Sequence, residues 1–113
     1  MNGMPEKKLK KTENNLPQCP VGASLKILGG KWRLRIINEI GEEKRRFGEL
    51  KRLIPDISEK MLIQELKALV EYDILTKKSY PQIPPRVEYS LTRKGVKVLP
   101  IIYSIRKFGE EAL

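Results

Sequence analysis

Histidine is absent from the sequence, and cysteine occurs only once, at Cys19. Without histidine, the most common general acid and base and the usual zinc ligand sets are excluded. A single cysteine also excludes a disulfide bond within one chain. We therefore expect no catalytic residues, no metal site and no cofactor.

Long apolar runs are lacking as well. The longest apolar stretch near the C-terminus, Val98 to Tyr103, is interrupted by Pro100 and is far shorter than the ~20 residues that cross a bilayer. The lysine-rich first residues have no apolar segment after them, which is unlike a signal peptide. We expect a flexible basic tail over residues 1–16, one domain over residues 17–113, and a cytoplasmic protein without a membrane contact.

Positive charge is in excess. The 23 Lys and Arg residues outnumber the 14 Asp and Glu residues, so the net charge is +9. Residues 1–15 contribute only +2 of this, and the remainder belongs to the part that is expected to fold. Such a surface favours a polyanionic partner, although a basic surface can also serve solubility alone.

Proline and glycine divide the remaining sequence into short segments. Pro20, Gly29-Gly30, Gly41 and Pro55 stand where apolar periodicity begins or ends, as is typical of helix termini. The patterns predict helices over residues 21–28, 31–40, 47–54 and 59–72, strands over 74–80 and 86–91, and a last helix after Thr92 that Pro100 kinks or divides. We expect Trp32 to lie in the core, because it belongs to an apolar periodic segment.

The segment over residues 59–72 has two distinct faces. Ser58 is placed to cap its first turn. Four apolar residues recur at helical spacing and predict a buried stripe: Leu62, Leu66, Leu69 and Val70. The opposite face then carries four polar residues: Lys60, Gln64, Lys67 and Glu71.

The two predicted strands form a hairpin around a proline-rich loop over residues 81–85. Lys77, Lys78 and Arg86 flank this loop and give the hairpin a basic character. The order of helices, tight turn, capped helix and basic hairpin predicts a mainly α fold with a small β-hairpin (α+β), a winged helix-turn-helix domain. The helix over residues 59–72 would be its recognition helix.

Several motifs in the same order add a closer resemblance. They are Cys19-Pro20-Val21, Gly29-Gly30-Lys31-Trp32, residues 46–50, residues 57–62, residues 84–92 and Gly95. Over residues 19–109 the sequence resembles the HxlR-type regulators. The resemblance implies a dimeric DNA-binding transcription regulator of bacteria or archaea, with dimer contacts made by terminal helices.

We expect the partner to be double-stranded DNA, bound sequence-specifically. Four side chains would reach the major groove: Ser58, Lys60, Gln64 and Lys67. Lys77, Lys78 and Arg86 would hold phosphates or the minor groove. These residues could instead form an ordinary solvated face. The alternative function is a basic dimeric interaction module that binds RNA or an acidic protein.

Apolar residues occupy more than one face of the last helix, so a partner helix should cover one of them. We expect a homodimer held by Ile101, Ile102, Ile105 and Phe108, with help from the first helix. Some regulators of the resembled family sense oxidants or electrophiles with an N-terminal cysteine, which makes Cys19 a possible redox sensor. Cys19 could equally be a cap residue without a sensory role.

Overall fold

The computed structural model describes residues 19–113, so the tail expected over residues 1–16 lies outside the described residues. One compact unit ends at Gly30, and a second runs from Lys31 to Leu113. The described part of the first unit is α1 (Pro20–Leu28). Pro20 occupies the first turn, where its missing N–H has no helical partner to lose, as the sequence predicts.

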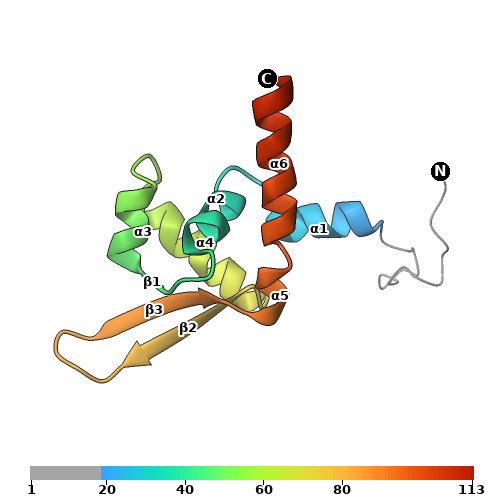
Figure 1. The fold of residues 1–113 in the computed structure, drawn as a ribbon. Helices are drawn as coiled ribbons and strands as arrows, with labels where there is room; N and C mark the ends of the chain where they lie inside the picture. The colour runs from blue at the N-terminus through green and yellow to red at the C-terminus, as the bar shows by residue number, and fades with distance from the viewer. Residues whose placement is uncertain (1–18) are drawn as a thin grey trace. The chain divides into compact units, whose positions relative to one another are not determined.

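The second unit is a winged helix-turn-helix domain (Figure 1). Its elements are α2 (Arg33–Ile40), β1 (Arg45–Arg46), α3 (Phe47–Leu53), α4 (Glu59–Glu71), β2 (Leu75–Tyr80), β3 (Arg86–Leu91), α5 (Arg93–Val96) and α6 (Leu99–Ala112). The predicted order of helices and hairpin is confirmed, while the short strand β1 was not predicted. Within residues 19–113, no helix is both long and apolar enough to span a membrane.

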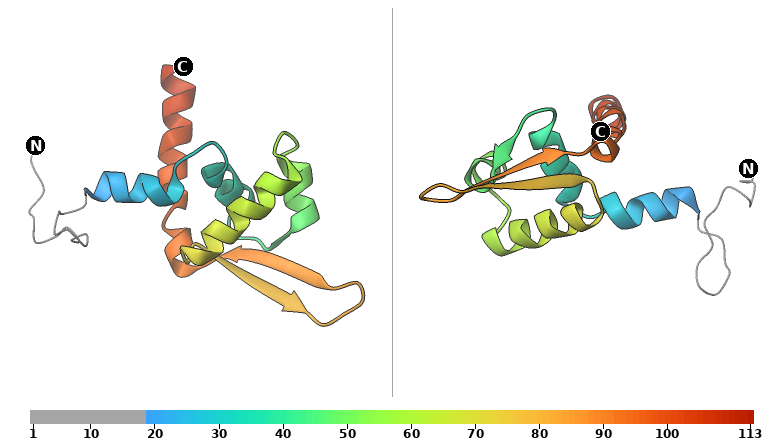
Figure 2. Two further views of the ribbon diagram at one scale, coloured as in Figure 1. Left: turned by 180° about the vertical axis from the view of Figure 1, so that it is seen from behind. Right: turned by 90° about the horizontal axis from the view of Figure 1, so that it is seen from below.

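The sheet is antiparallel, with the strand order β1-β3-β2. In the hairpin, Leu75 pairs with Leu91 at the base and Tyr80 pairs with Arg86 near the loop. The hairpin extends well beyond the helices as a twisted ribbon, which is the shape of a wing (Figure 2). β1 adds two residue pairs at the middle of β3, Arg45 with Tyr89 and Arg46 with Glu88, so the third strand does not reach the tip of the wing.

Apolar side chains from α2, α3, α4 and the sheet form the core of the second unit. The most deeply buried are Ile36, Ile37, Ile40, Leu50, Ile54, Ile57, Leu62, Leu66, Leu69 and Leu75. The prediction that Trp32 belongs to this core was wrong. Its ring is half-buried, and Lys31 Nζ and Arg35 Cζ lie 4.8 and 5.2 Å from the ring centroid. The two cations are attracted to the ring face, so it can stay partly in water.

Hydrogen bonds join the segment after α4, residues 72–74, to the start of α5, residues 92–95; we call this contact the joint. Thr92 Oγ1 donates to the carbonyl of Asp73 at 2.6 Å and accepts from the N–H of Gly95 at 2.9 Å. Lys94 Nζ donates to the carbonyl of Tyr72 at 3.0 Å. The expected division at Pro100 is observed, because α5 ends at Val96 and Pro100 stands in the first turn of α6.

Candidate nucleic-acid interface

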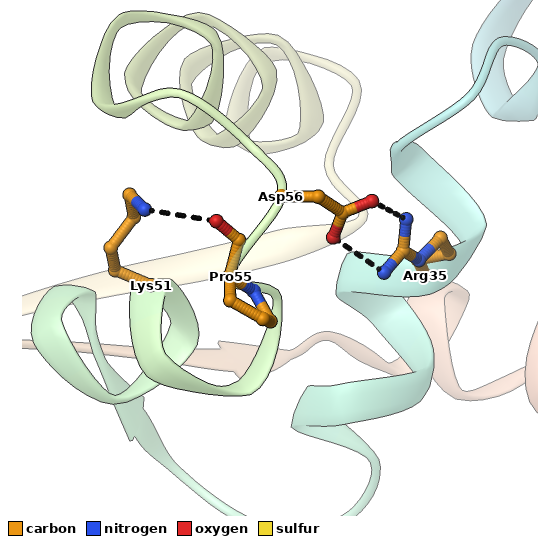
Figure 3. A network of polar contacts seen from close by, with 4 residues as sticks. All are labelled: Arg35, Lys51, Pro55 and Asp56. Atoms are coloured by element: carbon orange, nitrogen blue, oxygen red, sulfur yellow. Dashed lines mark hydrogen bonds and ion pairs between the residues drawn. The ribbon is translucent and has the colours of Figure 1, made fainter.

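The turn between α3 and α4 is fixed from both sides. Ile54 and Ile57 are each only 1% exposed and anchor it in the core. Outside, the Arg35 guanidinium donates two hydrogen bonds of 3.0 and 3.1 Å to the Asp56 carboxylate, and Lys51 Nζ donates to the Pro55 carbonyl at 3.4 Å (Figure 3). These contacts set the direction in which α4 leaves the turn.

Asp56 is charged at neutral pH. The hydrogen bonds from Arg35 hold the pKa of the Asp56 carboxyl below its usual value. The pair is exposed, so water and salt screen it, and we assign it a role in orientation more than in stability.

α4 begins as predicted. Ser58 Oγ accepts a hydrogen bond from the N–H of Met61 at 3.0 Å, and Glu59 lies in the first turn, where the helix dipole favours a negative charge. Because the cap uses Ser58 as an acceptor, its hydroxyl proton remains available to a phosphate.

The two faces of α4 also agree with the sequence pattern. Leu62, Leu66 and Leu69 are buried, and Val70 is half-buried. The predicted DNA-facing residues Lys60, Gln64 and Lys67 are exposed. Within residues 19–113, none of these three side chains has a hydrogen-bond or ion-pair partner. The structure therefore presents them as a row of free donors along one side of the helix.

Glu65, on the same helix, does not join this row. Its carboxylate pairs with the guanidinium of Arg33 on α2, and both side chains are largely covered. The contact ties α4 to α2 and neutralises a negative charge that would otherwise repel phosphates. Sequence reasoning missed it, because the partners are 32 residues apart and no local pattern links them.

The wing supplies further cations. Lys77 and Lys78 are exposed, as expected. Arg86 is half-buried instead: its guanidinium carbon lies 4.1 Å from the Tyr80 ring centroid, and its Nε lies 3.6 Å from Glu88 Oε2. The Nε atom is buried without a hydrogen-bond partner among the described residues. Arg86 thus stabilises the hairpin and is less accessible than the two lysines.

Cys19 is exposed and stands at the N-cap of α1. Hydrogen bonding from the backbone N–H groups of Gly22 and Val21 holds the pKa of the Cys19 thiol below its usual value. A larger share of thiolate than in an ordinary cysteine follows.

α6 carries an uncovered apolar face. Its members are Ile101, Ile105 and Phe108, with exposed fractions of 46, 50 and 62%. Ile102, which was expected on the dimer face, is only 8% exposed and belongs to the core of its own chain. The helical pattern alone did not separate the two stripes, because the sequence does not show which side of α6 rests on α2.

The model of the HxlR-like helix-turn-helix family matches residues 27–113. This chain belongs to that family. Among the relatives of this chain, a protein of Fusobacterium mortiferum named as the regulatory protein MalR is 42% identical over 98 residues, covering 86% of this chain and 92% of the relative. The expectation of a winged helix-turn-helix transcription regulator is confirmed, and the comparisons offer no support for an RNA-binding or acidic-protein-binding module.

Solved structures of similar regulators agree with the fold. A structure described as a MarR-family transcriptional regulator of Porphyromonas gingivalis W83 is 59% identical, with a TM-score of 0.82, and the match covers 85% of this chain and 94% of the other. The redox regulator HypR in its oxidised form is 37% identical, with a TM-score of 0.79, covering 84% of this chain and 98% of HypR.

Proposed function

We propose that this HxlR-type regulator binds operator DNA as a homodimer, with α4 in the major groove and the wing on the adjacent backbone. The observation that carries the proposal is the row of unpartnered donors on α4, Lys60, Gln64 and Lys67, which follows a turn fixed by Arg35 and Asp56. Such an arrangement suits base edges, because bound donors would first have to break contacts within the protein.

Each side chain has a distinct role in this proposal. Gln64 is suited to adenine, which offers one donor and one acceptor in the major groove, and Lys60 and Lys67 to guanine acceptors or phosphates. Ser58 donates to a phosphate at the start of α4. Lys77 and Lys78 bind the DNA phosphates through their charge. Arg86 contributes less, because its guanidinium already contacts Tyr80 and Glu88.

The homodimer is proposed from the exposed face of α6. Three large apolar side chains on one side of α6, each at least 46% exposed, would gain from burial against a second copy: Ile101, Ile105 and Phe108. A two-fold axis along this face matches a palindromic operator with half-sites about 34 Å apart. The proposal includes a cytoplasmic location, because a regulator must share a compartment with the operator that it binds.

A redox response is proposed as the signal. The lowered pKa and the exposure of Cys19 favour oxidation, and the similar protein HypR is described as a redox regulator. Since each chain has one cysteine, a disulfide requires Cys19 from both copies. Two thiolates would then lose two electrons to the oxidant.

The proposed DNA binding is tested by selection from a pool of random duplexes with the purified full chain. We expect a palindromic consensus that survives a large excess of nonspecific duplex, because specific sites are typically bound 10³-fold or more tightly. The proposal would be overturned if the nonspecific competitor displaced all selected sequences equally. It would also be overturned if the protein preferentially captured single-stranded RNA from a parallel pool.

A further inference from the structure

A groove of about 360 Å³ lies between α4 and the inner half of the wing. Its apolar lining comes from Ile63, Leu66, Val70 and Tyr89, and its charged lining from Lys67, Lys77 and Glu71. The volume is near the lower end of the ~300–1,000 Å³ range of small-molecule sites. All seven residues belong to the second compact unit.

We propose that this groove binds a small organic anion with an aromatic or branched apolar body, and that the bound anion competes with duplex DNA. The competition rests on the proposed function, because Lys67 and Lys77 are also assigned to DNA. The binding itself does not depend on that assignment.

The apolar lining argues for an organic ligand. Ile63 is 53% exposed although it is a large apolar side chain, and it borders the half-buried Val70. A bound hydrocarbon body would remove this surface from water. An inorganic anion would leave the same surface wet.

The charged lining argues for a negative ligand. Lys67 and Lys77 have no ion-pair partner within residues 19–113, and Glu71 pairs with neither, so the groove carries one net positive charge. Burial raises the pKa of Tyr89, so its phenol stays neutral near pH 7 and adds no negative charge. One carboxylate between the two ammonium groups would complete the charge balance.

Occupancy would oppose DNA binding in two ways. The carboxylate would neutralise Lys67 and Lys77, which would otherwise replace counterions on phosphates. The ligand body would also stand between α4 and the wing, the two elements that must straddle the DNA backbone. The groove thus offers direct competition without a change of fold.

The binding is tested by NMR titration of the DNA-free protein with 1-naphthoate, following the methyl signals of Ile63 and Val70. We expect saturable shifts, with weaker binding of the neutral isostere 1-naphthamide. Lys77→Gln should weaken the binding of 1-naphthoate by about threefold to fivefold, the scale of an exposed ion pair, without affecting the binding of 1-naphthamide. Ile63→Asn should weaken both ligands. Lys78→Gln is the matched control, because the neighbouring residue does not line the groove.

The competition is tested with a labelled operator duplex and fluorescence anisotropy. We expect 1-naphthoate to weaken operator binding at the concentrations that saturate the groove. The fold-loss of operator affinity, measured for each variant against its own affinity without ligand, should be smaller in Lys77→Gln than in the wild type. Absence of methyl shifts at millimolar ligand, or equal effects of Lys77→Gln and Lys78→Gln, would overturn the site. A saturated groove with unchanged operator affinity would overturn the competition. Failure of the proposed function would show separately, as absent operator binding without any ligand.

Discussion

In the proposed complex, Gln64 and Lys78 make two different kinds of DNA contact, which single substitutions can separate. Gln64→Ala removes a base-reading amide and should cost about 1–3 kcal/mol at one operator position, with little change on nonspecific duplex. Lys78→Ala removes a positive charge and should weaken all sequences alike and reduce the salt slope by about 1. Binding isotherms on operator and scrambled duplexes at several salt concentrations measure both. Unchanged operator affinity in both variants would place the DNA surface elsewhere.

The redox proposal can be tested by replacing the single sulfur atom of Cys19 with oxygen, in Cys19→Ser. Diamide should oxidise Cys19 from two copies to an intersubunit disulfide while the reagent takes up two electrons and two protons, and operator affinity should change. In Cys19→Ser, both the covalent dimer on a non-reducing gel and the affinity change should disappear. An affinity change of the same size in the variant would remove Cys19 from the response.

Gly95 is a residue whose side chain must be absent. A Cβ at this position would lie 2.3 Å from the Ile74 carbonyl oxygen and 3.2 Å from Leu91 Cδ2. Because the nearest atom is backbone, Gly95→Ala should lower the free energy of unfolding by about 1–3 kcal/mol. Gly48→Ala is the control, since its Cβ would meet only the side chain of Arg52, at 3.8 Å. Urea unfolding at one protein concentration compares them, and equal stability of both variants would contradict the close approach.

Residue roles that depend on local pattern could be predicted from the sequence, and those that depend on distant partners could not. The cap made by Ser58 and the exposure of Gln64 and Lys67 follow from capping preference and helical periodicity. Arg86 and Ile102 look equivalent to their basic or apolar neighbours in the sequence. Only the packing shows that Arg86 contacts Tyr80 and Glu88 and that Ile102 is buried in the core of its own chain.

At the scale of elements, the turn between α3 and α4 decides how α4 is presented. Ile57→Ala should lower the free energy of unfolding by about 2–5 kcal/mol, because it empties a site that is 1% exposed. Asp56→Asn should cost much less, since its pair with Arg35 is exposed. Urea titrations measure both, and a larger loss in Asp56→Asn would reverse the assignment.

The same turn has a pH dependence of known sign. The folded-state pKa of Asp56 is lowered, so the contribution of its pair with Arg35 is present above the ordinary pKa of an aspartate. It is lost as the pH falls through the lowered folded-state value. Asp56→Asn should therefore flatten stability in acid and leave its slope near neutral pH unchanged.

Element boundaries were predicted well where proline, glycine or a capping hydroxyl marks them. β3 matches the predicted strand over 86–91, and α4 ends at Glu71, one residue before the expected position. β1 has only two residues and no alternating pattern, so it exists through its pairing with β3 and could not be seen in the sequence.

At the scale of the whole molecule, the proposed homodimer depends on the exposed apolar face of α6. Ile105→Glu should weaken the homodimer by about 100-fold, because two-fold symmetry places the new charge in the interface twice. Light scattering at micromolar concentration should fall from twice the 13.1 kDa chain mass toward a single chain. Ile83→Glu introduces the same charge at a fully exposed residue between the wing strands and should leave the mass unchanged. A wild-type chain that is monomeric would refute this assembly.

The joint around α5 has a consequence for operator spacing. The three successive carbonyls directly after α4, those of Tyr72, Asp73 and Ile74, accept hydrogen bonds from Lys94 and Thr92. In the proposed dimer, a rotation of α6 would be passed through this short connection to α4 of each copy. The separation of the two copies of α4 would then change with the angle at which the two copies of α6 cross. In the proposed dimer, the length of the palindrome that fits would therefore depend on α5, a segment of only four residues.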